Sequence, residues 1–308
     1  MPTNQQTIPQ SDVDQENLSE LESALDASRS PSSEAAHAVS LKDTLRLSVH
    51  EGSVPRTTHL LEVEKASPQH LRHETVASNT SVDLLEVLTR FGYDPDAPGA
   101  QNTGEQGRRL IDYPEVLRSD AVVTWLVARG VSLDRGQEDY AVVPMPPPLL
   151  ETAAQFSSRA TFSLLREKGA KLGGRTLHLA VQFAAAIKAD PSVSPTTAFP
   201  GFDPSKKWAS DRKRMSEMLP YLVDELRLDV NAMDIERENA PTGHYGTPLC
   251  YAVYSNAAAV VKWLLSKGAD PRSGDANQRA DAKRLASALG ADKCLSAFQE
   301  WQESTTSD

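Results

Sequence analysis

Residues 246–272 read GTPLCYAVYSNAAAVVKWLLSKGADPR, and this pattern predicts two short helices that form a hairpin. Thr247 and Pro248 suit a tight turn that opens the first helix, because proline fixes φ and is tolerated at the first helical position. Asn256 breaks that helix, and Gly268 supplies the left-handed residue that ends the second one. Each helix carries an apolar stripe, made of Leu249, Ala252 and Val253 in the first and of Val260, Val261, Trp263, Leu264 and Leu265 in the second.

A hairpin of this kind cannot bury its apolar stripes alone, so the sequence should hold further copies of it. In the copy AVVTWLVARG, Trp125 and Gly130 have the same spacing as Trp263 and Gly268. Both tryptophans are therefore predicted to pack in the core of their repeats. Further copies are predicted near residues 41–61, 71–92, 148–170 and 175–226, of which the first two are degenerate and the last has its second helix delayed to 213–226. Two short helices between Leu285 and Trp301 should seal the end.

The hairpin at 246–272 and the segment RTLHLAV at 175–181 resemble the ankyrin repeat. The resemblance covers residues 40–302 and implies an all-α ankyrin-repeat solenoid of about six stacked helical hairpins plus a C-terminal cap. It also implies that His178, in the TLH motif, bonds to the backbone of a neighbouring turn. The positions equivalent to Gly268 in the last five copies are Gly92, Gly130, Gly169, Arg227 and Gly268, with steps of 38, 39, 58 and 41 residues.

The usual ankyrin step is about 33 residues, so the excess should lie in loops. Three insertions, 95–107, 134–148 and 235–245, fall between repeats, where the β-hairpin fingers of ankyrin arrays project beside the concave face. A fourth insertion, 190–211, separates the two helices of one repeat and is expected at the opposite edge. Long unequal loops of this kind are similar to those of fungal-type ankyrin proteins. They are either binding loops or tolerated drift, since lengthening a surface loop costs little free energy.

Charge and composition narrow the classes of partner and the compartment. The formal charge of -10 argues against nucleic acid, which needs a basic contact face. No apolar run reaches the roughly 18 residues that cross a bilayer, so no membrane association is expected. Cys250 and Cys294 do not make a disulfide framework, which favours a reducing, cytoplasmic location. Residues 1–39 and 303–308 are polar and are predicted to be disordered tails.

Two short polar clusters carry alternative functions. The run HLRHE gives His70, His73 and Glu74 a spacing that would share one helical face, but its order matches neither HExxH nor HxxEH, so structural histidines are favoured over a metal site. The cations Lys206, Lys207, Arg212, Lys213 and Arg214 form a basic cluster. That cluster is either a nuclear import signal or a solvated loop entering a helix.

The resemblance implies a monomeric, non-catalytic protein–protein interaction module without cofactor or metal, binding through its finger loops and concave helices. Two alternatives remain: an accessory scaffold of a metabolic pathway, and an enzyme with its site in the concave groove, where His244 and Tyr245 would act. A scaffold needs a shallow extended surface, whereas an enzyme needs converging titratable groups. The expected contact residues on the finger face are Asp96, Gln101, Glu105, Asp139, Tyr140, His244 and Tyr245.

Overall fold

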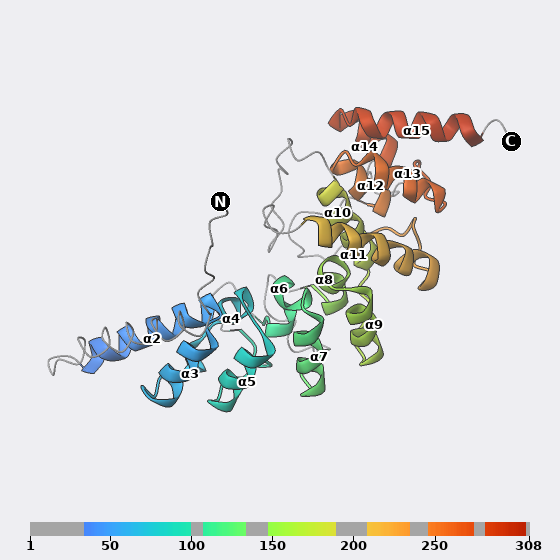
Figure 1. Ribbon diagram of the computed structural model, residues 1–308. Helices are drawn as coiled ribbons and strands as arrows, with labels where there is room; N and C mark the ends of the chain where they lie inside the picture. The colour runs from blue at the N-terminus through green and yellow to red at the C-terminus, as the bar shows by residue number, and fades with distance from the viewer. Residues whose placement is uncertain are drawn as a thin grey trace, which may run out of the picture. The chain divides into compact units, whose positions relative to one another are not determined.

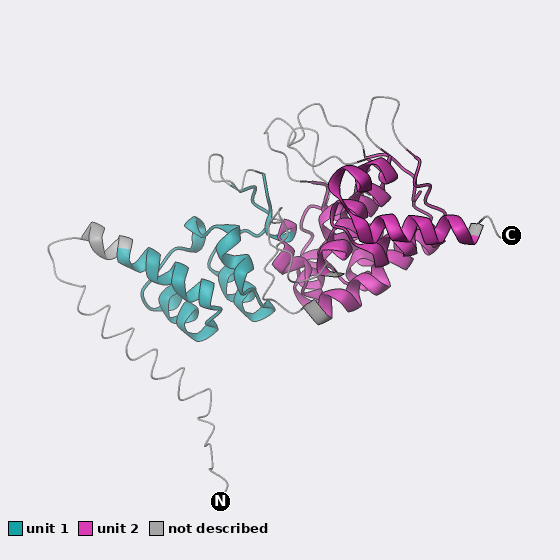
Figure 2. Ribbon diagram, turned by 90° about the horizontal axis from the view of Figure 1, so that it is seen from above, with its two compact units in different colours: residues 1–111 teal, residues 112–308 magenta. Residues whose placement is uncertain are grey.

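The structure is a computed structural model that describes residues 34–99, 107–133, 147–188, 208–234, 246–273 and 281–305. These residues are helical, and no β-strand occurs among them. The chain divides into two compact units, residues 1–111 and 112–308, which are coloured separately in Figure 2. In the ranges described, no helix is both long and apolar enough to span a bilayer.

Unit 1 holds two helical hairpins (Figure 1). The first pairs α2 (Glu34–Glu51) with α3 (Val54–Glu62), and the second pairs α4 (His73–Ser78) with α5 (Val82–Arg90). α2 packs on α4 and α3 packs on α5. The first helices of the two hairpins are therefore neighbours, and so are the second helices. Their shared core contains Leu45, Val49, Leu60, Leu61, Val76, Leu84, Leu85 and Leu88.

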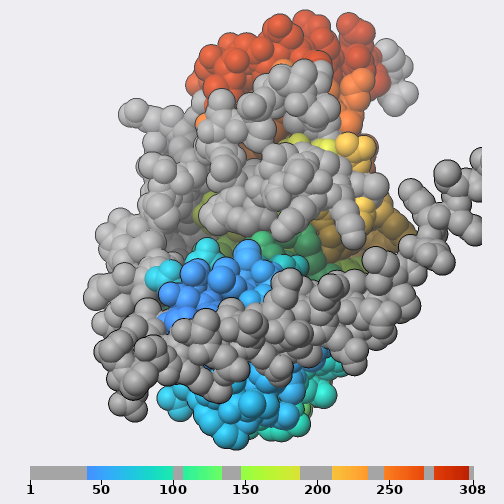
Figure 3. All heavy atoms as spheres, turned by 60° about the vertical axis from the view of Figure 1, so that its left-hand side comes forward, coloured from blue at the N-terminus to red at the C-terminus, as the bar shows by residue number. Residues whose placement is uncertain are grey.

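The first hairpin has charged side chains on the exposed face of its first helix. Lys42, Arg46 and Glu51 are exposed. They belong to α2, whose surface is drawn in blue in Figure 3. These charged side chains give α2 a solvated face.

Unit 2 continues the hairpin pattern. First helices are α6 (Pro114–Leu117), α8 (Leu149–Phe156), α10 (Thr176–Lys188), α12 (Pro248–Tyr254) and α14 (Ala282–Leu289). Second helices are α7 (Asp120–Ala128), α9 (Arg159–Glu167), α11 (Trp208–Pro220) with the π-helical turn η4 (Tyr221–Glu225), α13 (Ala258–Ser266) and α15 (Asp292–Thr305). Each first helix packs against the next one, and α10 also packs on α11. The final helices form a further hairpin, in which α15 extends to Thr305.

The residues that end the second helices occupy the predicted positions. All five predicted equivalents of Gly268 have positive φ, including Gly268 itself at 90° and Arg227 at 57°. After Gly268, the amide of Ala269 donates to the carbonyl of Leu264 at 3.0 Å, which satisfies a carbonyl at the helix end. Arg227 adopts the left-handed conformation at the one equivalent position without glycine, which is costly for a residue with a Cβ.

Three second helices begin with the same cap. Ser81, Ser119 and Ser158 each accept a hydrogen bond from the backbone amide three residues ahead, at 3.2, 3.4 and 3.1 Å. The helices that follow, α5, α7 and α9, each contain 9 residues. A serine at the start and a left-handed glycine at the end therefore define one repeated helical unit.

Two sequence expectations differ from the structure. Trp125 and Trp263 do lie at equivalent positions, but both side chains are half-buried instead of lying in the core. A cation just after each helix lies over the tryptophan ring. Cζ of Arg129 is 4.0 Å from the ring centroid of Trp125, and Nζ of Lys267 is 5.8 Å from that of Trp263. The delayed second helix begins at Trp208, before the expected residue 213, and becomes π-helical after Pro220, which has no amide hydrogen to donate.

Candidate protein-binding site

The first candidate surface is the root of the 95–107 loop in unit 1. The amide of Gly99 donates to the carbonyl of Arg108 at 2.8 Å, and Leu110 donates to Pro95 at 3.1 Å. The two sides of the loop are thus paired where they leave the helices. The carboxylate of Asp94 also accepts from the amide of Asp96 at 2.9 Å, which fixes the turn that precedes the loop.

His73 connects this root to α4. Its Nε2 lies 2.7 Å from the carbonyl oxygen of Ala97, and because a carbonyl only accepts, Nε2 must carry the proton. Nδ1 then accepts from the hydroxyl of Tyr93, 2.5 Å away. His73 is buried, so both bonds are shielded from water. The first helix of this repeat therefore holds the loop root through a side chain.

His178 plays the same part at the root of the 235–245 loop in unit 2. Its Nε2 donates to the carbonyl of Ala232 at 2.9 Å, and the amide of Asp234 donates across the loop to the carbonyl of Gly246 at 3.0 Å. Burial lowers the pKa of His178, so its imidazole is held neutral. The backbone bond that the sequence predicted for His178 is confirmed.

A second set of contacts closes around the same root. Tyr251 of α12 donates its hydroxyl to the carboxylate of Asp234 at 2.9 Å and accepts from the guanidinium of Arg175 at 3.0 Å. Asp234 is only 2% exposed, so its buried carboxylate needs hydrogen-bond donors such as this hydroxyl. Burial raises the pKa of the Tyr251 hydroxyl, which keeps it a proton donor. The ring of His178 packs edge-on against Tyr251 at 5.3 Å.

Glu151 occupies in α8 the position that His178 occupies in α10. Its buried carboxylate accepts from the backbone amide of Arg175 at 2.9 Å, at the start of α10. The direction of the hydrogen bond is reversed, because His178 donates to a carbonyl whereas Glu151 accepts from an amide. Gly173 lies directly on this carboxylate, where a Cβ would be 2.1 Å from Oε1. The side chain at this helical position again ties one repeat to the turn of another.

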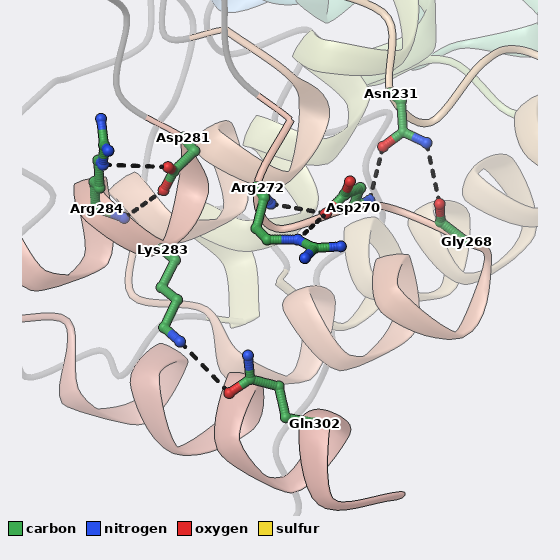
Figure 4. A network of polar contacts seen from close by, with 8 residues as sticks. All are labelled: Asn231, Gly268, Asp270, Arg272, Asp281, Lys283, Arg284 and Gln302. Atoms are coloured by element: carbon green, nitrogen blue, oxygen red, sulfur yellow. Dashed lines mark hydrogen bonds and ion pairs between the residues drawn. The ribbon is translucent and has the colours of Figure 1, made fainter. Parts of the chain in front are cut away.

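The turns of adjacent repeats are also joined directly, as Figure 4 shows. Asn231 donates through Nδ2 to the carbonyl of Gly268 at 3.0 Å and accepts through Oδ1 from the amide of Asp270 at 2.8 Å. Asp270 in turn accepts from the amide of Arg272 at 2.9 Å. Asn231 therefore sets the separation between two successive turns on the loop side of unit 2.

One stretch of unit 2 matches a known protein family. Residues 245–276 match the family model described as Ankyrin repeat. The chain contains an ankyrin repeat. Among solved structures, the ankyrin repeat domain of Bcl-3, a member of the IkappaB protein family, matches with 15% identity and a TM-score of 0.34, covering 84% of this chain and 85% of that chain. Among curated proteins, no sequence matches this chain.

Of the predicted contact residues, Asp96 lies in the described part of the chain. Its carboxylate is 3.3 Å from Nε of Arg109, and it sits in the turn that starts the 95–107 loop. The other predicted contact residues lie outside the described residues: Gln101, Glu105, Asp139, Tyr140, His244 and Tyr245. Sequence reasoning missed the anchors His73, Glu151, Arg175, Asp234 and Tyr251, which lie on or beside the helices.

The HLRHE run does not form one helical face. His70 ends a 3-10 turn, Leu71 and Arg72 are extended, and His73 starts α4, so the helical spacing assumed from sequence is wrong. Across the described ranges, no group of three His, Cys, Asp or Glu residues is placed to hold a metal ion.

The basic cluster is partly built into the fold. Arg212 and Arg214 lie in α11 and donate to the carbonyls of Ile187 at 3.3 Å and Phe156 at 2.9 Å. Lys206 and Lys207 lie outside the described residues. The cluster's arginines therefore have structural contacts as well as charge.

Proposed function

We propose that this protein is a non-catalytic interaction module that binds one or more proteins through the loops 95–107, 134–148 and 235–245. Ankyrin repeats are generally protein–protein interaction modules. The observation that carries the proposal is that two of these loops leave from roots fixed by His73 and His178. A loop with a fixed root loses less conformational entropy on binding than one that is free at both ends.

Burial of the two first helices α8 and α10 favours the loops as the contact surface. All side chains of α8, and those of α10 from residue 176 to residue 187, are buried. In this conformation these helices present little surface to a partner. The proposed contact residues remain Asp96, Gln101, Glu105, Asp139, Tyr140, His244 and Tyr245, and Asp96 stands at a fixed root.

The proposal includes the organisation of the chain. Residues 40–302 would form the ankyrin array, flanked by polar tails, and the protein would act as a monomer in the cytoplasm or nucleus. Cys250 and Cys294 are both buried thiols outside any disulfide, which supports a reducing compartment.

The test compares the full chain with two loop variants. In the first, the loops 95–107, 134–148 and 235–245 are each replaced by a short turn. In the control, the insertion 190–207 is shortened by a similar number of residues. Circular dichroism would check that both remain helical. Each protein is then used to capture partners from an extract of its own cells, with quantitative mass spectrometry.

We expect a partner that is retained by the wild type and the control and lost from the finger-loop variant. Loss from the control alone would move the binding surface to the other edge of the repeats. Recovery of the same proteins by all three would contradict binding through the finger loops.

A further inference from the structure

Two arginines, Arg118 and Arg214, lie close together where α6 and α8 end and α11 begins. This edge of the repeats is away from the loop roots. Arg118 directly follows α6, Phe156 ends α8, and Asp211 and Arg214 lie in the first turns of α11. These elements come from three successive repeats of unit 2. The cluster is therefore separate from the proposed finger-loop surface.

Arg118 is held in a fixed orientation. Its guanidinium lies over the ring of Phe156 at 4.7 Å, and its Nε is 3.6 Å from Oδ1 of Asp211. Stacking on an aromatic ring fixes the plane of the guanidinium fork, and the ion pair fixes its rotation. The stacking and the ion pair therefore hold the two terminal nitrogens of Arg118 in a fixed plane.

Two arginines share one carboxylate oxygen. Arg214 donates through Nη2 to the same Oδ1 of Asp211 that Arg118 approaches, and through Nη1 to the carbonyl of Phe156. Of the charges that act on Arg118, those of Asp211 and Glu115 attract it and that of Arg214 repels it. With Arg118 itself, the cluster therefore holds two cations and two carboxylates.

Arg118 has donors to spare. Its side chain is 25% exposed, and in the described part of the structure its contacts are the ion pair with Asp211 and the stacking on Phe156. Desolvation lowers the pKa of Arg118 despite the nearby Asp211, so the carboxylate does not fully offset the loss of water. A guanidinium has five N–H donors, and a planar pair of them matches two oxygens of one anion.

We propose that Arg118, supported by Arg214, binds a phosphate group. The stacked fork of Arg118 would contact two phosphate oxygens, and Arg214 would add a second positive charge beside it. Inorganic phosphate and the phosphomonoester of a phosphoserine side chain share this chemistry. This site is independent of the finger-loop function and requires no protein partner to be detected.

The test measures phosphate binding to the full chain by isothermal titration calorimetry at constant ionic strength. The ligands are inorganic phosphate and a short peptide containing one phosphoserine, with the unphosphorylated peptide as a blank. Arg118→Gln removes the fork, and Arg118→Lys keeps the charge without the paired geometry. Arg129→Gln is the matched control, because Arg129 also stacks on an aromatic ring, at 4.0 Å from Trp125, but is exposed.

We expect saturable binding by the wild type and by Arg129→Gln, and binding weaker by about tenfold or more in both Arg118 variants, as for loss of a charged hydrogen-bonding pair. Asp211→Asn should bind phosphate more tightly than the wild type, because it removes the competing carboxylate. Binding of both ligands would mark a site open to phosphorylated proteins. Binding of inorganic phosphate alone would confine it to the free anion.

No saturable binding by the wild type, or equal binding by Arg118→Gln, would overturn the proposal. Equal loss in Arg118→Gln and Arg129→Gln would show a non-specific charge effect and would also overturn it. Circular dichroism checks the fold of every variant. Should Asp211→Asn fail to fold, the comparison of Arg118→Gln with Arg129→Gln still decides.

Discussion

Gly173 packs against the carboxylate of Glu151 so closely that a Cβ at residue 173 would lie 2.1 Å from Oε1. The same carboxylate accepts from the amide of Arg175 at 2.9 Å. The two residues come from different repeats, so the contact ties α8 to the turn before α10. A side chain at residue 173 must displace this buried carboxylate from the amide of Arg175.

We therefore predict that Gly173→Ala destabilises the protein, and that Glu151→Ala costs less in that background than in the wild type. Each single change should cost about 1–3 kcal/mol, typical of disturbing a buried polar group. Urea unfolding of the four proteins in a double-mutant cycle measures the coupling. Additive costs would show that the two side chains act independently.

The stability of the protein should depend on pH through His178. Its pKa is lowered in the folded state, so the unfolded chain, with a pKa near 6.5, binds more protons in the window below that value. The contribution of His178 is thus complete above about pH 6.5 and is lost as the pH falls toward the native pKa. Urea unfolding at a series of pH values should show this slope, and His178→Gln should reduce it. An unchanged slope in the variant would assign the effect elsewhere.

Tyr251→Phe should loosen the root of the 235–245 loop without emptying the core. The ring is fully buried and would be retained, whereas Asp234 and Arg175 would lose the hydroxyl between them. We expect faster hydrogen exchange at the amide of Asp234, which donates to Gly246 across the loop. Exchange at α5 in unit 1 is the internal reference. Unchanged exchange at Asp234 would mean that the backbone pair holds the root alone.

Leu264→Ala should destabilise the repeat more than Trp263→Ala does. Leu264 is fully buried, and its loss should cost about 2–5 kcal/mol through transfer and cavity terms. Trp263 is half-buried beside Lys267. Each side-chain atom that its truncation removes therefore buries less area than an atom of Leu264 does. Thermal or urea unfolding ranks the two. A larger loss for Trp263→Ala would indicate that its ring holds a neighbouring repeat in solution.

Both cysteines should react slowly in the native protein. Burial raises the pKa of Cys294 to about 11 and also raises that of Cys250, so little thiolate exists near pH 8. Titration with a chromogenic disulfide should show slow reaction of the native chain and rapid reaction of both thiols in denaturant. Rapid reaction of a native thiol would place it on the surface in solution.

The turns were predictable from sequence because their signals are local. The spacing from Gly268 to its equivalents located the left-handed residues, and it did so even at Arg227, where no glycine marks the turn. The backbone bond of His178 followed from the family resemblance. In both cases a few neighbouring residues determine the conformation.

The anchors of the candidate site were not predictable because their partners are distant in sequence. His73 seemed to belong with His70 on one helix, but the extended residues between them separate the two, and His73 turns to Tyr93 and Ala97. Glu151 does not resemble His178, although it fills the same position, because it contacts a donor instead of an acceptor. Exposure of Trp125 likewise depends on the packing of neighbouring helices, which periodicity does not specify.

The repeated helical unit between a capping serine and a left-handed glycine suggests how such a chain can change over evolutionary time. α5, α7 and α9 are equal in length, whereas the segments that join the repeats are not. Lengthening a loop outside this unit leaves the register of the stack intact and adds little entropic cost. Selection can therefore vary the connecting segments while the scaffold is inherited unchanged, so two descendants of this chain can keep one fold and differ in the surface that their loops form.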